Sequence, residues 1–340
     1  MVRTDARSLL ALLALVPVVV PAAAAAQGPP TGRGGISLKW DRQFELRGQD
    51  VALQSQMLKL RGTLSQFVPG EAVTVRVNIG PRRIVLARRT VEPAGGGGAF
   101  TVDFRVTRAG VVHASALHDA SPSLGRLTGE SPRLDAFVPV AGRGARGLRV
   151  RFLQQRLAYI HYPVGVTGRY DAATGRAVLA YRKVNGLPRV SWASRAVFSR
   201  LALLRGGFVA RYPSHGRHVE ADLGHQVLVL LYPGGAVYRV FPMSSGKPST
   251  PTVVGSYRFY LKTFGINSLG MVHSNYFVGG YAVHGFRSVP THPASHGCLR
   301  IPLSDARFVY RWIRIGEGID VYYRGRRPPA HQRINPHPGP

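Results

Sequence analysis

The chain has 340 residues, a length that predicts two or three domains. Its apolar fraction of 45% is typical of folded domains. It carries 45 Lys and Arg against 16 Asp and Glu, and the resulting formal net charge of +29 predicts an anionic partner. The only cysteine, Cys298, excludes an intramolecular disulfide and leaves one free thiol with histidines nearby in the sequence.

The N-terminus has the pattern of a secretory signal. Arg3 and Arg7 precede an apolar run at 8–20, and an alanine run at 22–26 supplies a small-residue cleavage site. We therefore place a signal peptide at 1–26, and we expect no stable membrane span after its cleavage because the apolar run is short and broken by two prolines. An exported, basic protein is expected to meet anionic cell-envelope polymers and no nucleic acid.

Residues 27–141 predict a β-sandwich. Apolar and polar residues alternate at 73–79 and 100–106, and a further strand is expected at 111–117. The pair Pro69-Gly70 predicts a turn, and the glycines at 95–98 predict a flexible loop. Short strands separated by turns over about a hundred residues are typical of sandwiches. The arrangement resembles a bacterial immunoglobulin-like domain, and we expect it to act as a spacer.

Residues 145–206 predict three helices, because the apolar period changes from two to about 3.6 beyond a Gly/Arg stretch at 142–147. Asp171 is a candidate N-cap of the second helix. The segments 148–157, 168–178 and 185–187 resemble the small three-helix peptidoglycan-binding domain. A generic three-helix linker domain is the alternative.

From residue 208 onward the pattern returns to strands, with a hairpin predicted around Pro233-Gly234-Gly235 and a polar, proline-rich loop at 244–255 expected to border a cleft. The segment 325–340 is rich in Arg, Pro and His and is predicted to be disordered.

Cys298 lies two residues after His296 and fourteen after His284. A thiolate attacks and a thiol does not, so a neighbouring imidazole either raises the thiolate fraction or accepts the proton during attack. An inert buried cysteine is the alternative. Export makes an unpaired thiol harder to explain without a chemical role.

The residues His284-Gly285 and the run 295–300, Ser-His-Gly-Cys-Leu-Arg, resemble the catalytic domain of L,D-transpeptidases, over about residues 208–324. The resemblance implies a mainly β protein with a β-sandwich-like catalytic domain, preceded by the three-helix domain and the N-terminal sandwich. It also implies a secreted, extracytoplasmic, cell-wall-associated enzyme that cross-links peptidoglycan stem peptides between third residues. The reaction would pass through a thioester on Cys298, release D-alanine, and need no metal or organic cofactor.

The resemblance also implies roles for individual residues. Cys298 would be the nucleophile and His284 the general base, oriented by the carbonyl of Gly285. Backbone N–H groups at Gly297 and Cys298 would form the oxyanion hole, and His296 would support either the oxyanion or the loop. The candidate substrate contacts are Ser295, Arg300, Tyr276 and Met271, with a surface or packing role as the alternative for the last three.

The sequence departs from the family pattern in two ways. The interval between His284 and Ser295 is shorter than in many members, and Arg300 stands where some members have asparagine. Hydrolysis of the same thioester would make the protein an L,D-carboxypeptidase, and a non-catalytic wall-binding protein is a further alternative. Zinc binding by the His/Cys cluster and a papain-like or sortase-like peptidase fit the spacing and order of these residues less well.

Overall fold

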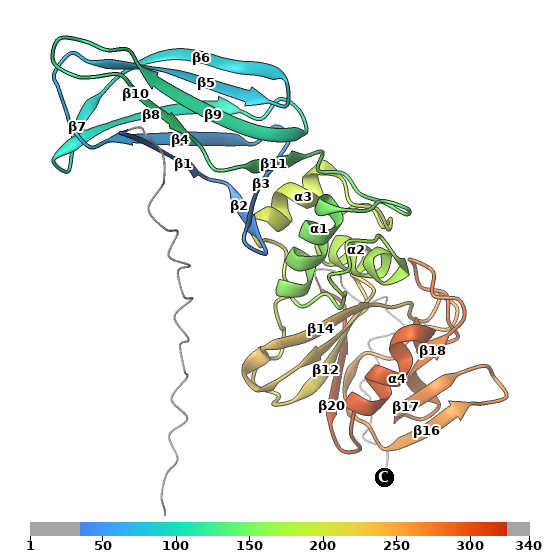
Figure 1. Ribbon diagram of the computed structural model, residues 1–340. Helices are drawn as coiled ribbons and strands as arrows, with labels where there is room; N and C mark the ends of the chain where they lie inside the picture. Colours follow the sequence, from blue (N-terminus) through green and yellow to red (C-terminus); the bar gives the residue numbers. More distant parts are fainter. Residues whose placement is uncertain (1–34, 325–340) are drawn as a thin grey trace, which may run out of the picture.

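The computed structural model describes residues 35–324, so the predicted signal peptide at 1–26 and the predicted tail at 325–340 lie outside the described residues. Figure 1 shows three units in chain order: a β unit, a group of three helices, and a second β-rich unit with one helix. The predicted mainly β fold class is confirmed. Within residues 35–324, no helix has the length and apolar character needed to cross a bilayer.

The N-terminal β unit contains two sheets. The four-stranded sheet has the order β1 (Ile36–Asp41), β4 (Met57–Leu64), β8 (Gly97–Arg105) and β7 (Glu92–Ala94). The seven-stranded sheet has the order β2 (Phe44–Leu46), β3 (Gln49–Leu53), β11 (Leu134–Phe137), β9 (Gly110–His118), β5 (Ala72–Ile79) and β6 (Arg82–Thr90), with β10 (Leu127–Glu130) paired to β9. The alternating strands predicted at 73–79, 100–106 and 111–117 correspond to β5, β8 and β9.

The glycines at 95–98 form a tight hairpin, and the prediction of a flexible loop there is wrong. Gly95 and Gly96 have positive φ angles and make the turn between β7 and β8. Gly97 and Gly98 belong to β8 and are buried, and a Cβ atom on Gly97 would lie 2.2 Å from the carbonyl oxygen of Leu64. The glycines are needed for close backbone approach rather than for flexibility.

The three helices are α1 (Leu148–Tyr159), α2 (Ala172–Val184) and α3 (Arg195–Ala202). The predicted N-cap is confirmed, because the Asp171 carboxylate accepts a hydrogen bond from the Thr174 N–H at 2.8 Å. Ser194 caps α3 in the same way, accepting a hydrogen bond from the Val197 N–H. The buried residues of all three helices face a common core.

The C-terminal unit contains two sheets and one helix. The five-stranded sheet has the order β14 (Val237–Pro242), β13 (Val227–Leu231), β12 (His218–Asp222), β20 (Gly318–Tyr322) and β15 (Gly255–Arg258), and a 3₁₀ turn at Pro233–Gly235 closes the predicted hairpin. The four-stranded sheet has the order β16 (Leu261–Ile266), β17 (Val272–Val278), β18 (Tyr281–Phe286) and β19 (Leu299–Pro302), and α4 (Leu303–Trp312) packs on it.

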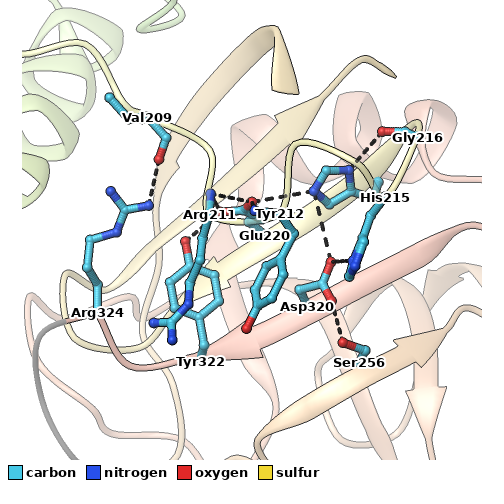
Figure 2. A network of polar contacts seen from close by, with 11 residues as sticks. Val209, Arg211, Tyr212, His215, Gly216, Glu220, Ser256, Asp320, Tyr322 and Arg324 are labelled. Atoms are coloured by element: carbon cyan, nitrogen blue, oxygen red, sulfur yellow. Dashed lines mark hydrogen bonds and ion pairs between the residues drawn. The ribbon is translucent and has the colours of Figure 1, made fainter. Parts of the chain in front are cut away.

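A polar network on the five-stranded sheet holds the segment that enters this unit (Figure 2). The buried Glu220 carboxylate accepts hydrogen bonds from the backbone N–H groups of Arg211 and Tyr212, both at 2.8 Å, and from the Tyr322 hydroxyl at 2.5 Å. Burial by itself would raise the pKa of Glu220, but these bonds and one from His218 lower it below its ordinary value. The ionised carboxylate therefore fixes the connection between α3 and β12.

One hydrophobic core runs through all three units. It is centred on the helices, and on one side the Phe137 ring of β11 lies 5.5 Å from the Phe152 ring of α1. On the other side, Val227 and Val229 of β13 and Val240 of β14 join the same core. The helical unit is thus packed between its two neighbours.

Candidate active site

Cys298 is positioned by the start of β19, which runs parallel to β18. The register pairs Val283 with Leu299 and His284 with Arg300. Because side chains alternate along a strand, Cys298 and Arg300 lie on the same face of the sheet as His284. The structure therefore brings the predicted nucleophile and base together on neighbouring strands. Cys298 is half-buried, and its Sγ lies 3.5 Å from the Gly280 carbonyl oxygen.

The geometry of His284 defines its tautomer. The ring is buried, and its Nδ1 lies 3.0 Å from the carbonyl oxygen of Gly285. A carbonyl only accepts, so Nδ1 carries the proton and Nε2 keeps its lone pair. Burial, reinforced by the Arg300 cation, lowers the pKa of His284 to about 4 despite the opposing hydrogen bond to Gly285. At neutral pH the imidazole is neutral and can accept a proton at Nε2.

The thiol is also neutral in the resting site. Burial raises the pKa of Cys298, and the backbone at Ala282 and the Arg300 cation offset only part of that effect. Of the two sequence-based possibilities, a preformed thiolate or proton transfer during attack, these pKa directions favour the second. A neutral thiol beside a neutral imidazole suits general-base catalysis.

A hydrogen-bonded turn shapes the chain just before the thiol. Ser295 is buried, and its hydroxyl donates to the Cys298 carbonyl at 2.5 Å and accepts from the Gly297 N–H at 3.0 Å. Gly297 has a φ of +125°, and a Cβ atom there would lie 2.5 Å from the Tyr281 ring. Ser295, predicted as a substrate contact, is placed as a support of the turn, and the Gly297 N–H already has a partner.

The polar loop at 244–255 fastens this turn from the other side. The Thr252 hydroxyl donates to the Gly297 carbonyl at 2.6 Å, and the Thr250 hydroxyl donates to the Ser295 carbonyl at 3.1 Å. The Lys247 N–H adds a bond to the same Ser295 carbonyl at 2.9 Å. The loop that the sequence places at the edge of a cleft therefore sets the backbone of residues 295–297.

The other predicted site residues differ in exposure. Arg300 is half-buried, with its guanidinium 4.1 Å from the centre of the Phe286 ring, and His296 is exposed. Tyr276 is half-buried on β17 and pairs with Ala282, which places it on the His284 face. Met271 is buried in the turn between β16 and β17, a position that favours packing over substrate contact.

The sequence reasoning missed a connection from the helical unit to this site. Arg189, just after α2, donates to the carbonyls of Thr291 at 2.7 Å and Gly224 at 2.9 Å. The buried Lys183 of α2 donates to the carbonyls of Gln226 and Met243 at 3.0 and 2.8 Å. Nothing in the local pattern signals these bonds, because their acceptors are backbone carbonyls distant in sequence.

The Gln226 side chain extends the connection toward the cysteine. It accepts from the Ser245 N–H at 2.9 Å, and the Ser245 carbonyl accepts from the N–H groups of Ala294 and Ser295 at 2.8 and 3.0 Å. A continuous chain of hydrogen bonds therefore joins α2 to the turn that carries Cys298.

The side chains of residues 35–324 do not converge as metal ligands, since no three His, Cys, Asp or Glu groups are suitably placed. A thiol and a neutral imidazole on one face of the sheet are the groups that acyl transfer by a cysteine requires.

The comparisons with known proteins agree with this class of site. A family model described as the L,D-transpeptidase catalytic domain matches residues 216–321, and one described as a putative peptidoglycan binding domain matches 146–191. A crystal structure of the L,D-transpeptidase from Xylanimonas cellulosilytica is 32% identical and covers 55% of this chain and 98% of its own, with a TM-score of 0.50. The chain belongs to the L,D-transpeptidase family.

Two further solved structures are more distant. The L,D-transpeptidase from Stackebrandtia nassauensis is 20% identical and covers 54% of this chain and 96% of its own, with a TM-score of 0.34. The L,D-transpeptidase 1 of Mycobacterium tuberculosis is 22% identical and covers 32% of this chain and 61% of its own, with a TM-score of 0.26. No curated protein matched the chain.

Proposed function

We propose that the protein is a secreted L,D-transpeptidase that joins two peptidoglycan stem peptides through their third residues. The observation that carries the proposal is the placement of Cys298 and His284 on one face of paired strands, with the His284 Nδ1 bonded to the Gly285 carbonyl. This arrangement leaves Nε2 available as the base for the only thiol of the chain.

In the first step, the Cys298 sulfur attacks the carbonyl carbon of the donor's third residue while His284 accepts the thiol proton. The carbon–sulfur bond forms, the amide carbon–nitrogen bond breaks, and the proton passes to the amine of the departing D-alanine. The Cys298 N–H is the first candidate to stabilise the oxyanion. The Gly297 N–H contributes only after it leaves the Ser295 hydroxyl, to which it is bonded here.

In the second step, a side-chain amine of another stem peptide attacks the thioester. Its nitrogen forms the new amide bond, the carbon–sulfur bond breaks, and His284 returns the amine proton to the thiolate. Arg300, His296 and Tyr276 are the side chains that we expect to meet the two peptides. Signal-directed export, attachment of the helices to the wall, and association of the basic chain with anionic envelope polymers belong to the same proposal.

The first prediction concerns the nucleophile. Incubation of the full chain with purified muropeptides should give dimers joined between third residues, together with free D-alanine, as measured by mass spectrometry. Cys298→Ala should remove both products because it removes the attacking atom. The family resemblance also implies that a carbapenem adds covalently to Cys298, which intact-protein mass should show for the natural chain and not for the variant.

The product pattern separates the alternatives. Trimmed monomers without dimers would identify an L,D-carboxypeptidase, because water would then be the acceptor. An unchanged product pattern in Cys298→Ala, or wall binding with no product at all, would contradict the proposal. Arg195→Ala is a suitable control, since this exposed arginine donates to the Gln54 side chain of the N-terminal β unit.

A further inference from the structure

Three large apolar side chains are exposed together at one end of the C-terminal unit. Phe264 and Ile266 on β16 and Leu269 in the following turn are 66%, 73% and 74% exposed. Figure 1 shows the β16–β17 hairpin, which this turn closes, extending beyond the rest of the unit, and α4 packs against β17. Single exposed apolar residues are ordinary, whereas three within six residues are typical of a binding surface.

These apolar residues lie on the α4 side of the four-stranded sheet. Phe264 stacks on His273 with ring centres 4.4 Å apart and meets Tyr310 of α4 edge-on at 5.7 Å. Lys262, on the same face of β16, donates to the carbonyl of Tyr310 at 2.7 Å. The hairpin and α4 therefore form one continuous surface.

The candidate active site lies on the opposite face of this sheet. A Cβ atom on Gly285 would lie 2.5 Å from the Ala306 Cβ, which shows that Gly285 faces α4. His284 precedes it on the same strand, so its side chain projects away from α4. The exposed apolar residues are thus separate from the Cys298 and His284 side of the sheet.

The same surface is strongly basic. Arg307 and Arg311 are exposed one turn apart on α4, and Arg314 is exposed just after it. Residues 256–278 and 306–316 contain no Asp or Glu. The flanking acids are occupied elsewhere, since Asp305 pairs with Arg176 and Glu317 pairs with Arg217. Both Arg307 and Arg311 act on His273, whose pKa is lowered by burial first and by these cations in addition.

We propose that this basic–apolar surface, formed by Phe264, Ile266, Leu269, Arg307 and Arg311, docks on an anionic phospholipid bilayer. Arginines beside exposed Phe, Ile and Leu match an interface that offers anionic headgroups next to hydrocarbon. A sugar-phosphate polymer would satisfy the arginines and leave the three apolar side chains in water. Docking through this surface turns the Cys298 and His284 face away from the bilayer, so a soluble or wall-bound substrate retains access to it. The proposal does not depend on the enzymatic activity.

Vesicle sedimentation of the full chain tests the surface. Binding should be stronger to vesicles of phosphatidylglycerol and phosphatidylcholine than to phosphatidylcholine alone. The triple variant Phe264→Ser, Ile266→Ser, Leu269→Ser should lower the partition coefficient by about tenfold or more, because it removes three inserting side chains. Its control is Leu86→Ser with Tyr159→Ser, which are 56% and 69% exposed on the other units and should leave binding unchanged.

The charge contribution needs its own variants, because a net charge of +29 attracts anionic vesicles without any specific surface. The double variant Arg307→Glu, Arg311→Glu should weaken vesicle binding. The control double variant Arg82→Glu, Arg83→Glu changes two exposed arginines on β6 and should weaken binding less. Equal losses from the two pairs would indicate adsorption by net charge alone and would overturn the proposal.

Fluorescence tests insertion directly. A tryptophan introduced as Ile266→Trp should shift its emission to shorter wavelength on anionic vesicles, whereas Leu86→Trp should not shift. No shift at position 266, or a triple serine variant that binds like the natural chain, would overturn the proposal. Concentration-dependent dimerisation that the triple variant abolishes would also overturn it, since the surface would then bind a second copy of the chain.

Discussion

At the scale of single residues, the site combines two groups that are both neutral at rest. His284 is kept neutral by burial and by Arg300, and Cys298 is kept protonated by burial. In the mechanism that we propose, the thiol becomes nucleophilic only as its proton moves to the His284 Nε2, so its reactivity depends on the arrival of an electrophile. The arrangement also protects the only thiol from indiscriminate reaction, because the thiolate is the reactive form.

The pH dependence of acylation follows from the pKa of about 4 at His284. The base is competent when unprotonated, so a lowered pKa extends activity toward acid. At pH 5, about nine-tenths of the imidazole is unprotonated with a pKa of about 4, against roughly one-thirtieth at the ordinary value of about 6.5. We expect the rate constant of covalent carbapenem addition to stay nearly constant from neutral pH to about pH 5 and to fall below it.

Stopped-flow or quenched mass measurements across pH check this expectation. A fall in the rate constant already near pH 6.5 in the natural chain (the acid limb of the pH profile) would contradict a neutral His284 with a lowered pKa. Arg300→Gln removes a cation that lowers the pKa of His284, so the acid limb should move to higher pH in that variant. The position of the limb is the relevant readout, because Arg300 is also a candidate substrate contact.

At the scale of secondary-structure elements, α2 and the residues after it support the cysteine turn. Arg189 bonds to the Thr291 carbonyl, and Ser244 bonds to the adjacent His292 carbonyl at 2.7 Å. These bonds hold the segment between His284 and Ser295 from outside it. The helical unit therefore serves the catalytic unit structurally, in addition to the wall attachment that we propose.

Arg189→Ala should reduce the rate of acylation by about tenfold, because charge-assisted hydrogen bonds of this kind contribute roughly 1.5–3 kcal/mol. The loss should appear in kcat more than in KM, since Arg189 positions the turn rather than the substrate. Arg189→Lys should restore only part of the rate, because an ammonium does not reproduce the fork of a guanidinium. Steady-state kinetics with muropeptides provides the measurement.

The same exposed Arg195→Ala variant is the control, and it should retain the natural kcat. A loss confined to KM in Arg189→Ala would show that the residue acts in substrate binding. An unchanged kcat would show that the cysteine turn keeps its geometry without the helical unit.

At the scale of the whole molecule, the helices share a core with β13 and β14 of the C-terminal unit and with part of the N-terminal β unit, while most of each β unit has a further core of its own. Phe152 is fully buried in the helical core, and Phe104 is buried in the separate core of the N-terminal β unit. The valines of β13 and β14 in the helical core, together with the bonds from Lys183 and Arg189, predict that the helical and catalytic units unfold together. Cooperative unfolding of this kind would make helical integrity a condition for activity.

Phe152→Ala should lower the free energy of unfolding by about 3–5 kcal/mol, as expected for an aromatic side chain removed from a core. The unfolding transition that shifts in this variant should coincide with the temperature at which covalent carbapenem addition is lost. Calorimetry measures the transition, and mass spectrometry at each temperature measures the addition. Phe104→Ala is the matched control and should leave the temperature dependence of addition unchanged. If the helices unfold at a temperature well below that at which carbapenem addition is lost, the helical and catalytic units do not unfold together.

The sequence by itself determined the mainly β class, the three helices with the Asp171 cap, and the family resemblance around His284 and Cys298. Those features depend on local signals: the apolar period, a capping side chain, and the rarity of a Cys/His motif. Tertiary structure alone decided the neutral state of His284 and Cys298, the support of the turn by Ser295 and Thr252, and the bonds from Lys183 and Arg189. The physical reason has two parts. The pKa of a group depends on its burial and on nearby charges, which only the folded chain sets. Every residue carries a backbone carbonyl, so the sequence does not indicate which carbonyl a given side chain will bond.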